Sequence, residues 1–160
     1  MMPPALFALM LGAFAIGTTE FVIVGLLPTI AADLGITLPS AGLAVSLYAL
    51  SVALSAPLLT AATARWPRKN VLLMLMAVFV LGNLLAWQAT SFATLLIARI
   101  VTGLAHGVFF SIGATIATQL VAKEKAARAI AMMFTGLTVA LVTGVPLGTF
   151  IGQHWGWQTT

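Results

Sequence analysis

The stretch LFALMLGAFAIGTTEFVIVGLLPTI, residues 6–30, decides the fold class of this chain. Glu20 is its one charged residue, and a helix needs about 20 mostly apolar residues to cross the bilayer core. Lipid tolerates helices or closed barrels, and the chain lacks the short alternation of barrel strands. We therefore predict an all-α membrane protein whose residues 1–160 form five transmembrane helices and no soluble domain. The charge-free runs place these helices near residues 5–30, 40–64, 70–88, 92–121 and 126–153.

The composition excludes a water-soluble domain. Of 160 residues, 61% are hydrophobic and 6% are charged, whereas soluble domains contain about a quarter charged residues. An excess of seven basic over three acidic residues would suggest nucleic acid in a soluble protein. This chain has no basic stripe or aromatic platform, so we expect no nucleic-acid partner. Cysteine is absent, which excludes thiolate chemistry. The start has no basic region, so we expect a retained first span and not a cleaved signal peptide.

Charge asymmetry predicts the orientation. Six of the seven basic residues lie in the connections at 65–69 and 123–128, and the other two connections contain none. The positive-inside rule places the basic connections and the N-terminus in the cytoplasm and residue 160 outside. We expect a multi-pass protein of the bacterial inner (cell) membrane. Four tryptophans fall at predicted helix ends, where we expect an interfacial belt: Trp66, Trp87, Trp155 and Trp157.

Glu20 and Arg99 are the charged residues inside the predicted spans. Counted from the outer helix ends, both lie roughly 12–14 Å deep. A structural ion pair and a functional pair are both open, although charged groups inside membranes are usually functional. His106 is two turns after Arg99, on the same face, with Gly103 between them leaving open space. It is a further functional group or a hydrogen-bonded packing residue. One other histidine is present, so we predict no metal site.

Several uncharged polar residues also fall within the spans. Tyr48, Ser51 and Ser55 form one stripe on the second predicted helix. The serines could instead bond back to carbonyls of their own helix. Asn83 in the third helix is expected to make an interhelical hydrogen bond. We assign Tyr48, Ser51 and Asn83 to a candidate substrate cavity.

Small residues recur every four positions in the fifth predicted helix. Such a stripe forms a flat groove that another helix can approach closely. Pro146 beside it frees a carbonyl and permits a bend. Static packing and a moving hinge both fit this pattern. The candidate packing residues are Gly136, Gly144, Pro146, Gly148 and Gly152.

Four segments together resemble the major facilitator superfamily, and within it the drug and sugar efflux branch, close to arabinose-efflux-like permeases. GTTEFVIVGLLPTIAADLGI (17–36) resembles helix 1 of that branch, and LIARIVTGLAHGVFF (96–110) resembles its helix 4 motif. GLTVALVTGVPLG (136–148) is similar to the helix 5 antiporter motif, and ATARWPRKNVLL (62–73) is similar to the gating loop.

The resemblance implies a fold of twelve helices in two six-helix bundles, of which this chain would be a fragment holding most of the N-terminal bundle. It implies proton-coupled efflux of small organic compounds, sugars or drugs, by alternating access, with no cofactor and no enzymatic activity. The partners would be the substrate, protons, the bilayer and the remaining helices. Glu20 would be the proton carrier, Arg99 its partner and His106 a secondary polar group. The gating residues would be Arg65, Arg68 and Lys69.

The gating loop departs from the family pattern. Ala64 stands where the family has an aspartate, and Thr60 and Pro67 occupy glycine positions. A second class of function is also open, namely a non-transporting membrane subunit or a half-unit that works after assembly with other chains. An intramembrane protease is a more distant alternative, because no nucleophile motif such as G-x-S-x-G surrounds Ser111.

Overall fold

The structure, a computed structural model, describes residues 3–160 and consists of helices and short connections, with no strand in that range. A π-helical turn, Ala140–Gly144, joins α5 and α6 into one continuous span, and 3₁₀ turns lie at Lys123–Lys125 and Trp157–Thr159. Five helices are therefore long and apolar enough to cross a membrane, which confirms the predicted fold class. The α-helices are α1 (Pro4–Asp33), α2 (Leu38–Ala62), α3 (Arg68–Trp87), α4 (Phe92–Gln119), α5 (Ala126–Val139) and α6 (Val145–Trp155).

The first helix is longer than the predicted range of 5–30 and ends at Asp33. Pro28 lies inside it, where it lacks an N–H but does not end the helix. Gly35 follows the C-cap residue Leu34, and its φ of +61° is a left-handed conformation that glycine adopts without a steric penalty. The amide of Ile36 donates to the carbonyl of Ala31 over 3.0 Å, the pairing of a Schellman helix end.

The second and fourth helices begin with hydroxyl caps. The amide of Ser40 donates to Thr37 Oγ1 over 3.3 Å, so α2 starts at Leu38 and not at residue 40 as predicted. The amide of Thr94 donates to Ser91 Oγ, also over 3.3 Å, at the start of α4. Each cap satisfies one of the amide groups that a helix N-terminus leaves without an intrahelical acceptor.

The fifth span, which we predicted over residues 126–153 with a bend permitted at Pro146, contains a π turn directly before α6, the segment in which this proline lies. In its π turn, the amide of Val145 donates to the carbonyl of Ala140, five residues earlier. Pro146 follows at once and has no N–H to donate to Val142, so the regular α-helical ladder cannot continue through this turn. A wide turn next to a proline is a common cause of a bend in a helix.

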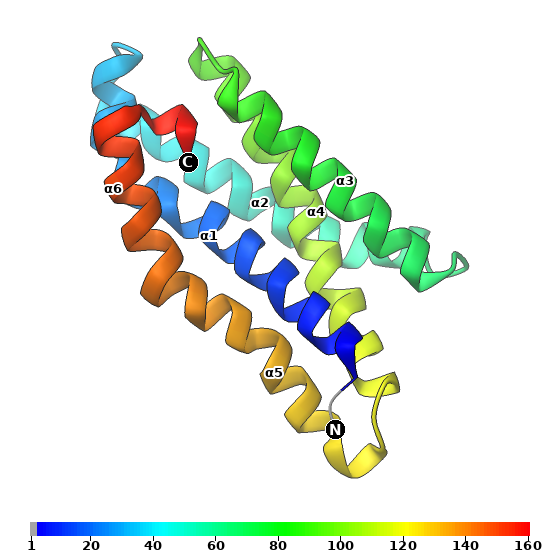
Figure 1. Ribbon diagram of the computed structural model, residues 1–160. Coiled ribbons are helices and arrows are strands. Elements are labelled where there is room, and N and C mark those ends of the chain that lie inside the picture. The colour runs from blue at the N-terminus through cyan, green and yellow to red at the C-terminus, as the bar shows by residue number, and fades with distance from the viewer. Residues whose placement is uncertain (1–2) are drawn as a thin grey trace.

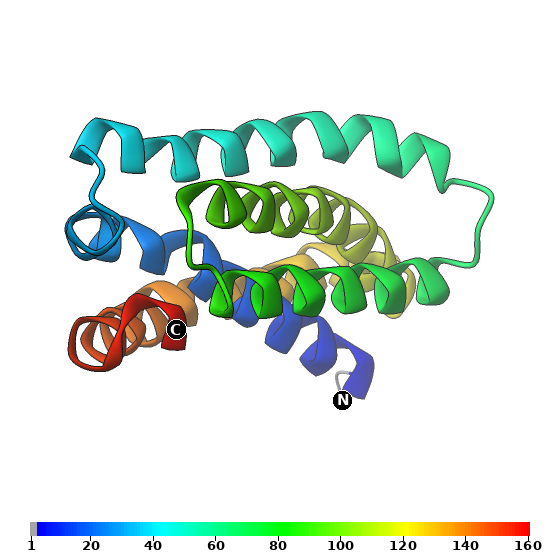
Figure 2. The ribbon, with the colours of Figure 1, turned by 90° about the horizontal axis from the view of Figure 1, so that it is seen from above.

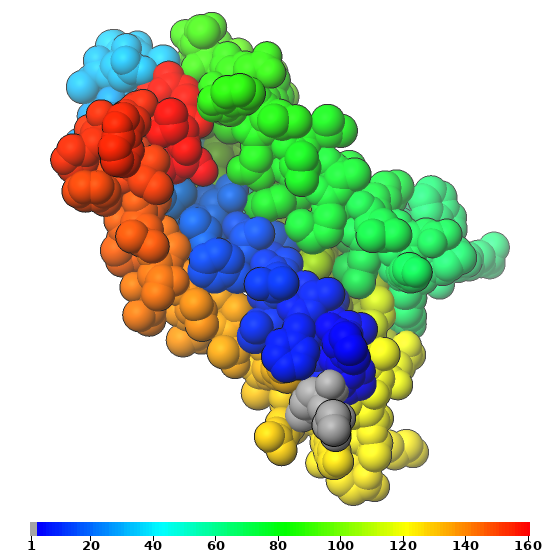
Figure 3. Space-filling model, in the orientation of Figure 1, coloured from blue at the N-terminus to red at the C-terminus, as the bar shows by residue number. Residues whose placement is uncertain are grey.

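The helices pack around α4. Seen from above, α4 lies between α2 and α3, and these are its main neighbours (Figure 2). On the other side of the bundle, α1 packs against α5, the π turn and α6 along most of their length (Figure 1). One face of the molecule shows α1 between the α5–α6 span and α3 (Figure 3). The helix that bears Arg99 is therefore the central one.

Two apolar clusters fill the interior, one toward each end of the helices. The first includes Leu6 to Ile16 of α1 together with parts of α3, the second half of α4 and the start of α5. The second includes Val22 to Ile30 of α1, Leu95 of α4 and Trp157. Glu20 falls between the α1 residues of these clusters, so the polar side chains form a layer between two apolar regions.

The four tryptophans lie at or just beyond helix ends, as predicted, but they differ in burial. Trp66, Trp87 and Trp155 are more than half exposed, whereas Trp157 is 5% exposed. Its indole Nε1 donates to Asp33 Oδ2 over 2.8 Å. This hydrogen bond joins the end of α1 to the 3₁₀ turn after α6, and the indole fills the apolar cluster there. Because the indole N–H has a carboxylate as its hydrogen-bond acceptor, Trp157 can be buried without leaving an unsatisfied polar group.

Candidate functional site

Arg99 is buried at 4% exposure and binds backbone carbonyls of two neighbouring helices. Its Nη1 donates to the carbonyl of Thr19 over 2.9 Å, and its Nη2 to that of Glu20 over 3.5 Å. Its Nε donates to the carbonyl of Ala44 over 3.3 Å. These contacts place Arg99 and Glu20 at the same depth, as the sequence predicted. They also link α4 to both α1 and α2 through one side chain.

The predicted side-chain ion pair between Glu20 and Arg99 is not formed within residues 3–160. The carboxylate of Glu20 instead lies 3.8 Å from Nδ1 of His106, with its side chain 26% exposed. The difference has a geometric cause. At this depth, backbone carbonyls of α1 face α4 and accept the hydrogen bonds of the guanidinium group. The side chain of Glu20 extends from α1 toward His106. Depth alone predicts which residues are neighbours but not which of their atoms meet.

His106 binds a residue of α2. Its Nδ1 lies 2.8 Å from the hydroxyl oxygen of Tyr48, whose side chain is 2% exposed. The guanidinium carbon of Arg99 lies 3.9 Å from the centre of the Tyr48 ring, a distance at which a cation and an aromatic face attract each other. Tyr48 therefore stands between Arg99 and His106. No hydrogen bond joins His106 to Ser111 in the described chain, and the imidazole is not arranged as the base of a serine nucleophile.

Gly103 does not leave the open space that we predicted. The carbonyl of Tyr48 and the Cβ of Ser51 lie within 3 Å of the position that a Cβ on Gly103 would take. One turn further, Gly107 is in a similar position against the carbonyl of Val52. The missing side chains let the backbone of α2 approach α4 closely enough for Tyr48 to reach both Arg99 and His106.

The serines of α2 have local partners. Ser51 Oγ donates to the carbonyl of Leu47 over 2.7 Å, and Ser55 Oγ donates to the carbonyl of Val52 over 3.3 Å. Both are buried. The alternative reading of the stripe, in which the hydroxyls bond back to their own helix, therefore describes both serines. Tyr48 is the member of the stripe that reaches another helix.

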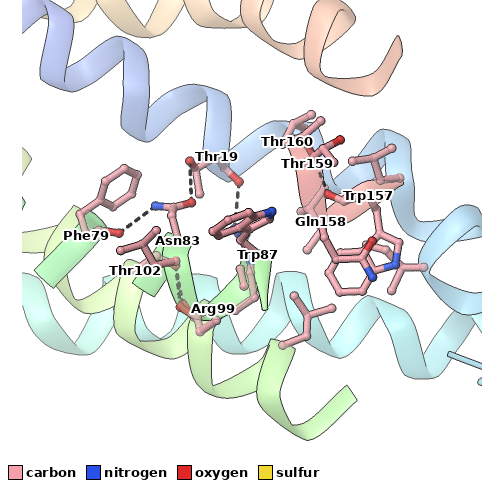
Figure 4. A pocket seen from close by; sticks show the side chains of 18 of the residues that line it. Thr19, Phe79, Asn83, Trp87, Arg99, Thr102, Trp157, Gln158, Thr159 and Thr160 are labelled. Atoms are coloured by element: carbon pink, nitrogen blue, oxygen red, sulfur yellow. Dashed lines mark hydrogen bonds between the residues drawn. The ribbon is translucent and has the colours of Figure 1, made fainter. Parts of the chain in front are cut away.

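A cavity of about 590 Å³ lies between α1, α3 and α4, with residues 157–160 at one end. Its walls are mainly apolar, and its polar side chains include Thr19, Asn83, Arg99 and Thr102. Asn83 lies between Thr19 and Phe79 (Figure 4): its Oδ1 accepts from Thr19 Oγ1 over 3.3 Å, and its Nδ2 donates to the Phe79 carbonyl over 2.8 Å. The expected interhelical hydrogen bond of Asn83 is thus present.

The candidate cavity residues are consequently not brought together. Asn83 lines the cavity, whereas Tyr48 and Ser51 lie in the α2–α4 contact and do not line it. The spacing of a polar stripe on a helix is the same whether the stripe faces a cavity or a neighbouring helix. The glycines of α4 decide between the two here, because they draw α2 against α4 along this stripe.

The helix that faces the small-residue stripe of the fifth span is α1. A Cβ on Gly136 would meet the carbonyl of Met10, and one on Gly144 would meet the hydroxyl of Thr18. Gly148 and Gly152 face the side chains of Val22 and Leu26. Pro146 is at the start of α6, directly after the π turn.

The predicted gating residues lie at the connection between α2 and α3. Arg65 is in the turn after α2, while Arg68 and Lys69 form the first turn of α3, and all three are exposed. Within residues 3–160, no group of three or more histidine, cysteine or acidic side chains is placed to hold a metal ion.

Sequence reasoning missed two features of this region. One is the set of carbonyl oxygens that bind Arg99, which no side-chain pattern can reveal. The other is the pairing of Asp33 with Trp157. These two residues are far apart in the sequence, and a polar residue next to a helix end gives no signal of its partner.

Comparison with known proteins identifies the class. The model of the Major Facilitator Superfamily matches residues 9–160, and this chain belongs to that family of membrane transporters. It is therefore a multi-pass membrane protein, and the resemblance inferred from the four motifs is confirmed.

Three relatives show how far the similarity extends. The uncharacterized MFS-type transporter YtbD of Bacillus subtilis is 58% identical over 155 residues, which are 97% of this chain and 39% of YtbD. The inner membrane transport protein YdhP of Escherichia coli is 46% identical over 153 residues, 96% of this chain and 39% of YdhP. A chloramphenicol resistance protein of Streptomyces lividans is 39% identical over 159 residues, 99% of this chain and 41% of that protein. The chain thus spans about two fifths of the length of the curated relatives that it matches.

Proposed function

We propose that this chain is part of a proton-coupled exporter of small organic compounds, sugars or drugs, which works by alternating access. The observation that carries the proposal is Glu20. It is a partly exposed carboxyl group in the middle of a transmembrane helix, with its carboxylate 3.8 Å from Nδ1 of His106 and its backbone carbonyl bound by the buried Arg99. A carboxyl group in the membrane is costly and is retained mainly where it binds ions or substrate. The similarity to a chloramphenicol resistance protein supports export as the direction of transport.

We assign different roles to the charged groups. We assign to Glu20 the role of binding and releasing the transported proton, because its carboxyl group is partly exposed and a proton can reach it. Arg99 keeps its proton at any working pH, and its donors are engaged by three carbonyls. Arg99 therefore organises α1, α2 and α4 around Glu20. His106 is the secondary polar group that lies next to the carboxylate.

The cavity between α1, α3 and α4 supports the proposal that the functional transporter contains more helices than this chain. It is an apolar hollow beside the described C-terminal residues, and the relatives are much longer than this chain. We propose that further transmembrane helices of the full-length transporter cover this side of the bundle. Asn83 would lie where these helices contact α3. The substrate would then bind near Glu20, together with helices that this chain does not contain.

The basic connections give the proposed orientation in a bacterial inner membrane. Arg65, Arg68 and Lys69 would lie at the cytoplasmic side and take part in gating, with Ala64 unable to supply the aspartate that the family has there. Residue 160 would be external. Reporter fusions after Trp66 and Lys123 should read cytoplasmic, and a fusion after Thr90 should read external; the reverse pattern would contradict this orientation.

The test of the function is Glu20→Gln in the full-length transporter. The amide keeps the shape and a hydrogen bond but cannot titrate. We expect proteoliposomes with an imposed pH gradient to lose uphill transport while downhill exchange of substrate continues. Glu124→Gln, which removes an exposed carboxyl group from a connection, is the matched control and should transport normally.

The stability of the same variant separates coupling from a structural role. Arg99 binds backbone carbonyls and not the Glu20 carboxylate, so the variant should not leave an unpaired buried charge. We expect its free energy of unfolding to change by less than about 1 kcal/mol, compared with the 3–5 kcal/mol typical of a broken buried pair. A stable Glu20→Gln protein that still concentrates substrate would contradict the proposed proton carrier. A full-length protein that binds substrate but moves none would favour the non-transporting subunit.

A further inference from the structure

Two oxygen atoms face a single ring nitrogen at the centre of the bundle. Nδ1 of His106 lies 2.8 Å from the Tyr48 hydroxyl and 3.8 Å from Glu20 Oε2. The first distance is that of a hydrogen bond, and the second is too long for one. A neutral imidazole nitrogen offers one lone pair or one N–H. It therefore cannot bond well to both oxygens at once, and Tyr48 and Glu20 compete for it.

The Tyr48 oxygen is a fixed point in this arrangement. The side chain is 2% exposed, and its ring lies under the Arg99 guanidinium. Its backbone is pressed against Gly103, and Arg99 is itself held by three carbonyls. Glu20, by contrast, has a long side chain that is 26% exposed. The movable partner of the competition is therefore the carboxyl group of Glu20.

The protonation state of Glu20 decides which arrangement is more stable. When the carboxyl group is neutral, Tyr48 donates to Nδ1 and the imidazole holds its proton on Nε2. When the carboxyl group has released its proton, its lone pairs oppose the lone pair on Nδ1. The imidazole then favours the tautomer with its proton on Nδ1, which donates to the carboxylate in a charge-assisted bond. One proton leaves Glu20, and the number of protons on the neutral imidazole stays the same.

We propose that Tyr48 is a positioning residue that competes with Glu20 for Nδ1 of His106 and thereby sets the pH at which the Glu20 carboxyl group binds and releases its proton. This inference rests on the proposed function of Glu20 as proton carrier. The titratable groups that face His106 are Glu20 from α1, Tyr48 from α2 and Arg99 from its own helix. From α5, the ring of Phe134 reaches the region through Phe110, which packs on the imidazole.

The decisive variant is Tyr48→Phe in the full-length transporter. It keeps the ring under Arg99 and removes the hydroxyl. His106 is then free to donate to the ionised carboxyl group, so Glu20 releases its proton more readily. We expect the pH dependence of uphill transport to move toward acid by about half to one pH unit, with the KM for substrate unchanged. Ser55→Ala is the matched control, because it removes another buried hydroxyl of α2 that bonds to its own helix. Its pH profile should match that of the parent protein.

A spectroscopic readout tests the inference without transport. The NMR spectrum of ¹⁵N-histidine-labelled protein reports the tautomer of His106, and the His106 signal is assigned by its loss in the His106→Gln variant. In the Glu20→Gln variant, His106 should keep the Nε2–H tautomer across the pH range. The parent protein should change from the Nε2–H to the Nδ1–H form as pH rises. This measurement leaves Tyr48 in place, so it remains informative if Tyr48→Phe fails to fold.

The outcomes separate this inference from the proposed function. A folded Tyr48→Phe protein whose pH profile and His106 tautomer both match the parent would overturn the role of Tyr48, even if Glu20→Gln abolishes coupling. If Glu20→Gln still concentrates substrate, the proton-carrier role fails. The tautomer change would then show whether Tyr48 and Glu20 still compete for the imidazole.

Discussion

The α2–α4 contact and the contact of α1 with the α5–α6 span both use glycines to bring helices together, but they do so differently. In α4, Gly103 and Gly107 both meet the backbone of α2. In the fifth span, Gly136 meets the backbone of α1, whereas Gly152 meets the flexible end of Leu26. The first contact is uniformly close and contains the Tyr48–Arg99–His106 cluster. The second changes from backbone contact in α5 to side-chain contact at the π turn and in α6.

This difference indicates what each contact can tolerate. A polar cluster with defined distances needs a rigid support, and close packing of backbone on backbone provides one. A contact made by side chains can adjust by changing rotamers. The comparison therefore predicts that adding one methyl group will have unequal effects at glycines that look alike in the sequence, and that the effect will diminish along the fifth span.

The largest effect is expected for Gly136→Ala. The new Cβ would meet the carbonyl of Met10, and two backbones cannot adjust by rotating side chains. We expect the full-length transporter in detergent to lose about 3 kcal/mol of unfolding free energy, the upper part of the range for overpacking. Gly42→Ala is the control, because nothing lies within 4 Å of its new Cβ. It should be neutral or more stable by up to about 1 kcal/mol. Equal stabilities for the two variants would remove the basis of the comparison.

An intermediate effect is expected for Gly103→Ala. Its Cβ would lie 2.8 Å from the Tyr48 carbonyl and 2.9 Å from the Ser51 Cβ. Moving α2 away by a few tenths of an ångström costs about 1–2 kcal/mol and lengthens the bond between Tyr48 and His106. We therefore expect a shift in the pH profile in addition to the loss of stability, measured by unfolding and by transport on the same preparation. A loss of stability with an unchanged profile would show that the polar cluster does not depend on this contact.

The smallest effect is expected for Gly152→Ala. The atoms nearest to its new Cβ are the two methyl groups of Leu26, at 2.8 and 2.9 Å. These lie at the end of a side chain that can change rotamer, so we expect a loss below about 1 kcal/mol in the same unfolding assay. A loss as large as that of Gly136→Ala would show that α6 is held as rigidly as α5.

Much of the fold could be predicted because its signals are local. Five long apolar runs and the basic connections can be identified without knowledge of the tertiary structure, and they led to five spans with Glu20 and Arg99 at one depth. The site was less predictable. Asn83 has the interhelical bond that was expected, but Ser51 bonds to its own helix and Arg99 binds carbonyls in place of the Glu20 carboxylate.

The amino-acid sequence by itself determined the membrane class, the number of spans, the family and the shared depth of Glu20 and Arg99, because hydropathy and charge act along the chain without reference to other helices. The tertiary structure alone decided that His106 binds Tyr48 and that Trp157 is buried against Asp33. These depend on how closely helices approach and how they are rotated about their axes. A rotation of a few tens of degrees changes every partner of a side chain while it leaves the hydropathy pattern unaltered.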